Sequence, residues 1–321
     1  MQSFEQLLTA FEKRFKVRHF PDNPETLYDP AQYILGIGGK RVRPVLCLMG
    51  NELFDDIKPS AWEAATAVEL FHNFTLIHDD IMDQAPLRRG METVHTKYGT
   101  NTALLAGDVV MIMAYEHLKK IDPQILPQIL SIFNKTALEV SEGQQLDMDF
   151  EKRAEVSLDE YLQMITLKTS VLLAGSLQIG ALIGGAGEGN ARHIYEFGKN
   201  LGIAFQVQDD YLDAFGDPEK FGKQVGGDIL ANKKTFLMIQ ALKTASVNDK
   251  NRLIELQSMN IPEKVQEVLE IFKKSGVDEW AMTLKNNYIE KAFEHLEAIA
   301  VIGHRKEPLR ELATFLVQRQ Y

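Results

Sequence analysis

Apolar residues recur at intervals of three and four along most of the chain, which is the spacing of helices with one buried face. Before one such run, the segment 60–63 (Ser-Ala-Trp-Glu) predicts a capping box at the start of a helix that continues to Asp83. A second capping box is predicted at 157–160 (Ser-Leu-Asp-Glu), before another helix. No sustained apolar–polar alternation calls for a sheet, so the pattern predicts an all-α protein.

Proline and glycine residues mark the expected connections between helices. They predict loops near residues 20–30, 84–101, 184–190 and 214–232. No low-complexity tract or change in composition marks a linker. A chain of 321 residues can bury a large core, and we expect a single domain over residues 1–321.

Composition narrows the class of protein. The formal net charge of -10 argues against a nucleic-acid binder. Cys47 is the single cysteine, which excludes an internal disulfide and fits a reducing cytoplasm. The N-terminal segment does not resemble a signal peptide. Residues 171–187 are uncharged, but they are too few and too rich in glycine for a good membrane span, so we expect a buried helix and no integral membrane segment.

Two acidic segments, 79–83 and 209–213, share the pattern D-D-x-x-D. On a helix, the first and last carboxylates of each motif lie one turn apart on the same face. Hard carboxylate oxygens without nearby cysteine favour Mg2+, which is usually completed by water and substrate phosphates. The pair of motifs therefore predicts a magnesium-dependent site for a multiply charged phosphate ester.

Basic residues flank the first motif on both sides. Arg88 and Arg89 follow it beyond the predicted helix end, and arginine binds phosphate oxygens bidentately. Upstream, Lys40 and Arg43 are expected to share one helix face at i and i+3. His72 lies on the motif's own helix, about two turns before the first aspartate. Each residue alone is explained as a solvated surface group, and only their joint presence favours an anion site.

Polar residues also surround the second motif. Gln206 precedes it by three residues on the same helix face. Lys223 and Lys233 follow it in a glycine-rich stretch. Lys168 and Thr169 are expected on the helix that begins after Ser157. Residues 142–147 (Glu-Gly-Gln-Gln-Leu-Asp) add a further helical carboxylate and amide.

Two Glu-x-x-His steps, Glu69 with His72 and Glu92 with His95, allow a different interpretation as a di-iron carboxylate bundle. We disfavour it because Glu92 follows a Pro/Gly break. Arginines beside the site would also disfavour two cations without phosphate.

With these motifs the chain resembles the trans-isoprenyl diphosphate synthases, the family of farnesyl and geranylgeranyl diphosphate synthases. The resemblance covers residues 35–240 and includes GGKRVRP, the 72–89 segment, EGQQLD, KTS and FQVQDDYLD. It implies an isoprenoid-synthase fold, a single all-α helical bundle around a central active-site cavity. It also implies a homodimer and three Mg2+ ions in each active site.

The resemblance assigns roles to most of the residues named above. It implies that Mg2+ is bound by Asp79, Asp83 and Asp209, with Asp213 acting through water. It implies that the allylic diphosphate is held by Arg88, Lys168, Lys223 and Lys233. It implies that isopentenyl diphosphate is held by Lys40, Arg43, His72 and Arg89. Thr169 and Gln206 would lie beside the developing allylic cation.

The implied reaction is the condensation of isopentenyl diphosphate with dimethylallyl, geranyl or farnesyl diphosphate by ionisation, condensation and elimination. In the family, an aromatic residue five positions before the first motif limits product length, and Phe74 holds that position. A second aromatic at the next position favours C15, but Thr75 stands there. Phe71 lies one turn further from the motif, and a growing product is expected to meet the ring of Phe74 or of Phe71 as a floor. The motif also lacks the insertion typical of bacterial farnesyl synthases. We predict a C20 product, with C15 as the alternative.

Two further functions compete with this prediction. A class I terpene cyclase shares the first acidic motif, but its second metal motif usually mixes Asn, Ser/Thr and Glu. A non-catalytic regulatory subunit of a prenyl synthase typically lacks one acidic motif, whereas both are intact here. Activity of the purified chain alone separates a synthase from a regulatory subunit.

Overall fold

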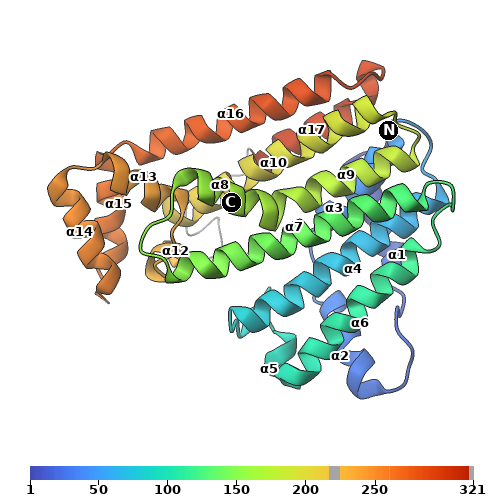
Figure 1. Ribbon diagram of the computed structural model, residues 1–321, viewed down its shortest axis with the longest axis horizontal. Coiled ribbons are helices and arrows are strands. Elements are labelled where there is room, and N and C mark those ends of the chain that lie inside the picture. The colour runs from blue at the N-terminus through green and yellow to red at the C-terminus, as the bar shows by residue number, and fades with distance from the viewer. Residues whose placement is uncertain (217–224, 260, 318–321) are drawn as a thin grey trace. The chain divides into compact units, whose positions relative to one another are not determined.

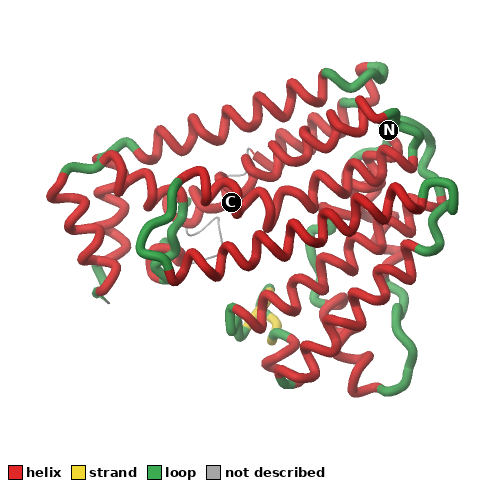
Figure 2. The backbone as a smooth tube through the Cα atoms, viewed as in Figure 1, coloured by secondary structure: helices red, strands yellow, loops and turns green. Residues whose placement is uncertain are grey.

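The computed structural model describes residues 1–216, 225–259 and 261–317, and helices dominate it (Figures 1 and 2). The helices of the first half are α1 (Phe4–Phe15), α2 (Glu25–Gly36), α3 (Val42–Glu52), α4 (Pro59–Met82), α5 (Val94–Tyr98), α6 (Thr100–Leu118) and α7 (Leu126–Lys152). Those that follow are α8 (Leu158–Ile165), α9 (Val171–Ile183), α10 (Glu188–Phe215), α12 (Gly227–Leu230), α13 (Phe236–Thr244), α14 (Val247–Ser258), α15 (Lys264–Lys274), α16 (Val277–Glu297) and α17 (Glu307–Val317). The predicted all-α fold class is confirmed.

Regular structure other than α-helix is brief in the described residues. A π-helical turn, η1 (Thr166–Ser170), joins α8 to α9, and a 3-10 turn, η2 (Gly303–Arg305), precedes α17. Strands β1 (Leu87–Arg88) and β2 (Met91–Glu92) form an antiparallel hairpin within the predicted 84–101 loop.

The chain divides into two compact units. Unit 1 comprises Met1–Lys135, Gly175–Tyr195 and Ile299–Pro308. Unit 2 comprises Thr136–Ala174, Glu196–Ala298 and Leu309–Tyr321. Helices α7, α9 and α10 each contribute residues to both units, so each acidic motif is described below with the unit that contains it.

The core of unit 1 is built around α4 and α6, which run side by side (Figure 1). Ala64, Val68 and Phe71 on α4 and Ala106 and Val110 on α6 are all buried in this core. Helix α4 is thereby fixed along its length, and it carries the first acidic motif at its C-terminal end.

Glycines bring α3 and the second half of α9 into backbone contact within unit 1. A Cβ atom added to Gly180 would lie 1.8 Å from the carbonyl oxygen of Cys47, and one added to Gly50 would lie 2.4 Å from that of Leu177. Because the obstacles are backbone atoms, no side-chain rotation can make room for a methyl group.

Gly180→Ala is therefore expected to destabilise the protein by about 3 kcal/mol, although alanine favours a helix more than glycine does. Chemical denaturation measures the change in the free energy of unfolding. Gly187→Ala is the control, because its added methyl group meets no atom within 4 Å. Equal stability of the two variants would contradict the close approach of α3 and α9.

Unit 2 has its own apolar core, formed by α8, α10, α13, α14, α15 and α16. Tyr161 of α8, Val207 of α10 and Phe236 of α13 are buried there. The rings of Tyr161 and Phe236 are 6.0 Å apart. This core supports α10 along the segment that carries the second acidic motif.

The predictions of helix starts and loops were partly right. Ser157 caps α8 with both hydrogen bonds of the capping box, as predicted. The box predicted at residue 60 is wrong: α4 begins at Pro59 after Lys58, and the Ser60 hydroxyl accepts instead from the backbone N–H of Asp122. The predicted 20–30 loop is also too long, since α2 begins at Glu25 with Pro30 inside it.

One stretch of the described residues, Leu158–Ile183, is long and apolar enough to cross a membrane by length and composition. Its mean hydropathy reaches 1.4, but 72% of that window is buried inside the folded chain. A buried core helix passes the same test, and burial is what the sequence predicted for residues 171–187.

Candidate functional site

The first acidic motif ends helix α4 in unit 1. The backbone N–H of Asp83 donates to the carbonyl oxygen of Asp79 at 2.8 Å, so the two residues stand one helical turn apart. Asp83 is the C-cap residue and is exposed, whereas Asp79 is half-buried. Two carboxylates at this spacing can approach one cation from the same side.

The second aspartate of this motif, Asp80, has a different role. Asp80 is 1% exposed, and its carboxylate pairs with Arg88 of β1. Arg88 donates from Nε to Oδ2 at 2.8 Å and from Nη2 to Oδ1 at 2.7 Å. This bidentate pair holds the arginine beside the motif. The sequence identified Arg88 but gave no indication that Asp80 fixes it.

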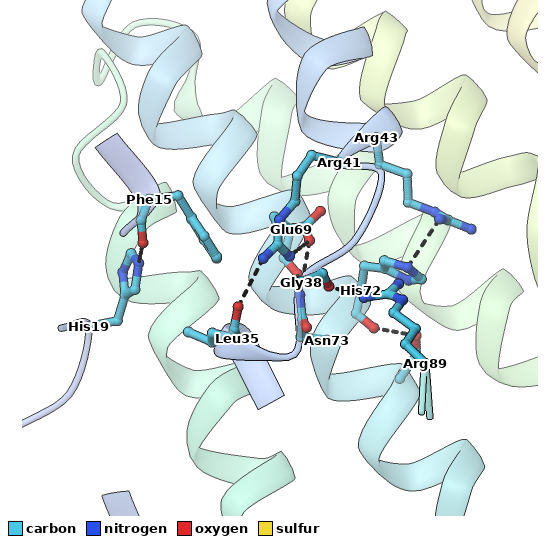
Figure 3. Close-up of polar contacts among 11 residues, drawn as sticks. Phe15, His19, Leu35, Gly38, Arg41, Arg43, Glu69, His72, Asn73 and Arg89 are labelled. Atoms are coloured by element: carbon cyan, nitrogen blue, oxygen red, sulfur yellow. Dashed lines mark hydrogen bonds and ion pairs between the residues drawn. The ribbon is translucent and has the colours of Figure 1, made fainter. Parts of the chain in front are cut away.

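A cluster of basic side chains lies upstream of the motif in the same unit (Figure 3). Arg43 of α3 donates from Nη1 to Nε2 of His72 at 3.1 Å. His72 therefore accepts at Nε2, as a neutral imidazole does. Burial, followed by the nearby Arg43, Arg89, Arg88 and Arg41, lowers the pKa of His72 well below its ordinary value. A neutral histidine and several arginines in one place suit an anionic ligand.

The surroundings of Arg43 also favour a bound anion. Burial lowers its pKa to about 10, and Glu69 only partly opposes this change. The guanidinium is still charged at neutral pH, but its buried Nε has no hydrogen-bond partner among the described residues. A buried donor without a partner costs free energy, so an oxygen-rich anion would stabilise this arrangement.

The loop before α3 corrects one prediction. Lys40 does not share a helix face with Arg43, because α3 begins only at Val42. Gly38 and Arg41 both adopt positive φ, at 88° and 47°, and these turns keep Lys40 outside the helix at an exposed position. Arg89 donates from Nη1 to the carbonyl oxygen of Gly38 and so holds this loop next to the hairpin (Figure 3).

Arg41 anchors the same loop from inside. It forms a buried ion pair with Glu69 and donates to the carbonyl oxygen of Leu35 at 2.9 Å. Glu69 also accepts from Asn73 at 3.1 Å. The buried ion pair with Arg41 competes with any metal ion for this carboxylate, which is a physical reason to disfavour the Glu69–His72 step as half of a di-iron site. In the described residues no group of three or more His, Cys, Asp and Glu side chains is placed to hold a metal ion.

The second acidic motif lies on α10 in unit 2. Its second aspartate, Asp210, is buried, as Asp80 is in the first motif. Asp210 accepts from the Tyr161 hydroxyl and, at 2.9 Å, from Nε2 of Gln206. Burial raises the pKa of Asp210 to about 7, although both hydrogen bonds act in the opposite direction. The sequence identified Gln206 but missed Tyr161, which precedes its partner by 49 residues.

Asp213, the last residue of this motif, contacts the segment that follows. Its Oδ2 accepts from the backbone N–H of Asp228 at 3.0 Å, at the start of α12. Lys233 lies 3.4 Å from Oδ1 of Asp228. Burial lowers the pKa of Lys233, but Asp228 and then Asp147 outweigh burial, and the net shift is upward. Lys223 lies outside the described residues.

Lys168 and Thr169 lie in the π-helical turn η1 rather than on a continuous α-helix as expected. Lys168 donates from Nζ to Oδ2 of Asp147 on α7 at 2.5 Å. A Cβ atom on Gly143 of α7 would lie 2.2 Å from the backbone nitrogen of Lys168. Glycine at that position therefore lets α7 touch the turn, and π turns are frequent at functional sites.

The three residues assigned to product length lie on α4. Phe71 is 1% exposed and packs against Phe133, with ring centroids 5.4 Å apart. Phe74 is half-buried, and its ring lies 4.6 Å from that of His78. The Thr75 hydroxyl donates to the carbonyl oxygen of His72 at 2.8 Å. Phe74 is therefore more accessible than Phe71.

Comparison with known proteins identifies the group to which these features belong. The family model described as polyprenyl synthetase matches residues 24–275. The chain belongs to the polyprenyl synthetase family. The prediction of an isoprenyl diphosphate synthase is thereby confirmed, and the family uses Mg2+.

Individual relatives agree along nearly the whole chain. A short chain isoprenyl diphosphate synthase of Methanothermobacter thermautotrophicus is 37% identical over 93% of this chain and 92% of its own length. A geranylgeranyl diphosphate synthase of Saccharolobus solfataricus is 38% identical over 95% of this chain and 94% of its own. A crystal structure of a geranylgeranyl pyrophosphate synthase superposes with a TM-score of 0.94 at 44% identity and covers 100% of both chains.

The residues present fit the ion that the family uses. Each motif offers carboxylate oxygens, and the single cysteine, Cys47, is buried on α3 outside both motifs. Because neither motif supplies three acidic ligands, the remaining positions fall to water and phosphate oxygens, as Mg2+ prefers.

Proposed function

We propose that the chain is a short-chain trans-prenyltransferase that condenses isopentenyl diphosphate with dimethylallyl, geranyl and farnesyl diphosphate to form C20 geranylgeranyl diphosphate. The observation that carries this proposal is the repeated construction of the two acidic motifs. In each motif the second aspartate is buried and accepts hydrogen bonds from side chains: Asp80 from Arg88, and Asp210 from Tyr161 and Gln206. The outer carboxylates occupy less buried positions. The names of the relatives support the C20 product.

The experiment that tests this function uses the purified chain with Mg2+, isopentenyl diphosphate and dimethylallyl diphosphate. Mass spectrometry of the products gives their chain length. We expect a C20 prenyl diphosphate; a C15 product would keep the reaction and correct its length. Absence of condensation with any allylic primer would favour the regulatory subunit, and release of diphosphate without isopentenyl diphosphate would favour a cyclase.

The residues divide by the substrate they would hold. We assign Mg2+ to Asp79, Asp83 and Asp209, with Asp213 acting through water, and three ions in each active site. We assign the allylic diphosphate to Arg88, Lys168, Lys223 and Lys233. We assign isopentenyl diphosphate to Lys40, Arg43, His72 and Arg89.

Bound Mg2+ would supply positive charge that stabilises the departing diphosphate. The chain's own contribution begins with Arg88 and Lys168, which neutralise further charge on that group. Each is already oriented by a carboxylate, Asp80 and Asp147 respectively. Phosphate oxygens would replace or share these contacts, so little side-chain reorganisation accompanies binding.

Gln206 would act on the allylic cation. Since its Nε2 donates to Asp210, its amide oxygen is directed away from that carboxylate. The oxygen, together with the Thr169 hydroxyl, would offer partial negative charge to the cation in a site that excludes water. Arg43 and neutral His72 would hold isopentenyl diphosphate for attack. The proton lost afterwards would pass to the released diphosphate, so no protein nucleophile is required.

Phe74→Ala is expected to lengthen the main product by at least one isoprene unit, because it removes an accessible ring five residues before the motif. Product analysis by mass spectrometry measures the change. Phe11→Leu is the control: this ring of α1 is 1% exposed in the core and is not assigned to product length, so its loss should lower stability without changing the product. An unchanged product from Phe74→Ala would remove this residue as the limit on length.

The remaining expectations concern assembly and location. We propose that residues 1–321 form one polyprenyl synthetase domain, because α7, α9 and α10 each supply both compact units. We also propose a cytoplasmic homodimer. Sedimentation of the purified chain tests the dimer.

A further inference from the structure

Lys233 and Lys234 are adjacent residues of one type, and sequence alone cannot distinguish their roles. The structure gives their ammonium groups different partners. Nζ of Lys233 lies 3.4 Å from Oδ1 of Asp228. The Lys233 side chain is 62% exposed, so a ligand can reach it. Lys234 instead turns to the backbone at the end of another helix.

Three carbonyl oxygens at the C-terminal end of α7 accept hydrogen bonds from Lys234. They belong to Phe150 at 2.7 Å, to Glu151 at 3.5 Å and to Arg153. The last carbonyls of a helix lack intrahelical partners and carry partial negative charge. An ammonium group has three N–H donors, so this cap uses the full capacity of Lys234. It is therefore committed to structure and not to phosphate.

The segment 226–235 is held at two further points, both within unit 2. Asp213 accepts from the backbone N–H of Asp228 at 3.0 Å. Lys264, buried on α15, donates to Oδ1 of Asn232 at 2.8 Å. Asn232 has a φ of 55°, a left-handed conformation that asparagine tolerates better than most residues. Contacts thus fix the backbone on both sides of Lys233.

We propose that Lys234 is a positioning residue for Lys233: by capping α7 it holds segment 226–235 so that the neighbouring ammonium group meets the allylic diphosphate. This inference rests on the proposed function, which gives Lys233 its phosphate-binding role. Helix α7 also carries Asp147, the partner of Lys168. Lys168 is held directly by this carboxylate, so the proposal assigns the effect of the cap to Lys233 alone.

Calorimetry of the full chain with inorganic pyrophosphate and Mg2+ tests the proposal without turnover. Lys234→Met is expected to weaken pyrophosphate binding about 10-fold, the lower end of the effect seen when a residue that orients a metal ligand is lost. Lys234→Arg keeps charge and donors and should bind nearly as the unmodified chain does. Lys250→Met is the matched control, because Lys250 likewise donates to a carbonyl at a helix end, that of Lys243 at 3.2 Å, away from this segment.

A double-mutant comparison separates positioning from direct binding. If Lys234 acts through Lys233, the variant Lys233→Met/Lys234→Met binds pyrophosphate no more weakly than Lys233→Met alone. A full further 10-fold loss in that background would overturn the proposal, as would unweakened binding by Lys234→Met. Should the methionine variant not fold, Lys234→Gln replaces it in the same comparison. Failure of the proposed function would appear differently, as an unmodified chain that binds pyrophosphate but forms no condensation product.

Discussion

Asparagine at both Asp79 and Asp83 is expected to lower kcat/KM for condensation at least about 10³-fold, which corresponds to several kcal/mol of lost transition-state stabilisation. The substitution keeps the size of each side chain but removes both charges from the predicted Mg2+ ligands. Steady-state turnover with isopentenyl and dimethylallyl diphosphate at saturating Mg2+ measures the effect.

The control for this substitution is Asp122→Asn in the same unit. Asp122 is exposed, and its Oδ1 accepts from the backbone N–H of Gln124 at 2.9 Å, a contact that asparagine can also make. We expect unchanged activity and stability from it. A loss of less than about 10-fold from the double asparagine variant would exclude the first motif from transition-state stabilisation.

Combining substitutions in the two motifs tests whether they serve one chemical step. Groups that act as a unit show strongly non-additive effects, because removing one already forfeits what the other contributes. Adding Asp209→Asn to the first-motif variant should therefore cost far less than Asp209→Asn costs alone. Equal losses in both backgrounds would indicate that the motifs act independently.

The sequence was sufficient for the fold class and for the class of enzyme. Helical periodicity is a local property, and the D-D-x-x-D spacing places two carboxylates on one helix face wherever the helix packs. Family resemblance then supplied the reaction. These predictions required no knowledge of which segments meet in space.

To predict the contacts that orient the site residues, one must know which segments meet in space, and the sequence did not provide this. Nothing in the motif indicates that Asp80 and Asp210 turn inward, because their partners Arg88 and Tyr161 lie in separate segments. The cap on α7 likewise joins residues 84 positions apart. Lys40 was misplaced for a local reason: positive φ angles at Gly38 and Arg41 delay the start of α3.

Gly143→Ala is expected to lower kcat about 100-fold, because small displacements of catalytic groups have effects of this size. The added methyl group would lie 2.2 Å from the backbone nitrogen of Lys168, so η1 and α7 must separate. That movement displaces Lys168 from Asp147 and changes the position of Thr169. Both side chains are assigned to the allylic substrate, so the loss should fall on ionisation rather than on binding of isopentenyl diphosphate.

Two measurements distinguish this displacement from simple loss of fold. The KM for isopentenyl diphosphate should change little, since its assigned residues Arg43 and His72 belong to unit 1. Ser141→Ala on the same helix is the control, because the exposed serine hydroxyl donates within its own helix, to the carbonyl oxygen of Ala137. A folded Gly143→Ala chain with normal kcat would show that catalysis tolerates a shifted π turn. A selective fall in kcat would instead show that catalysis requires glycine at position 143. A residue without a side chain is needed there because the backbone of α7 contacts the turn that carries Lys168.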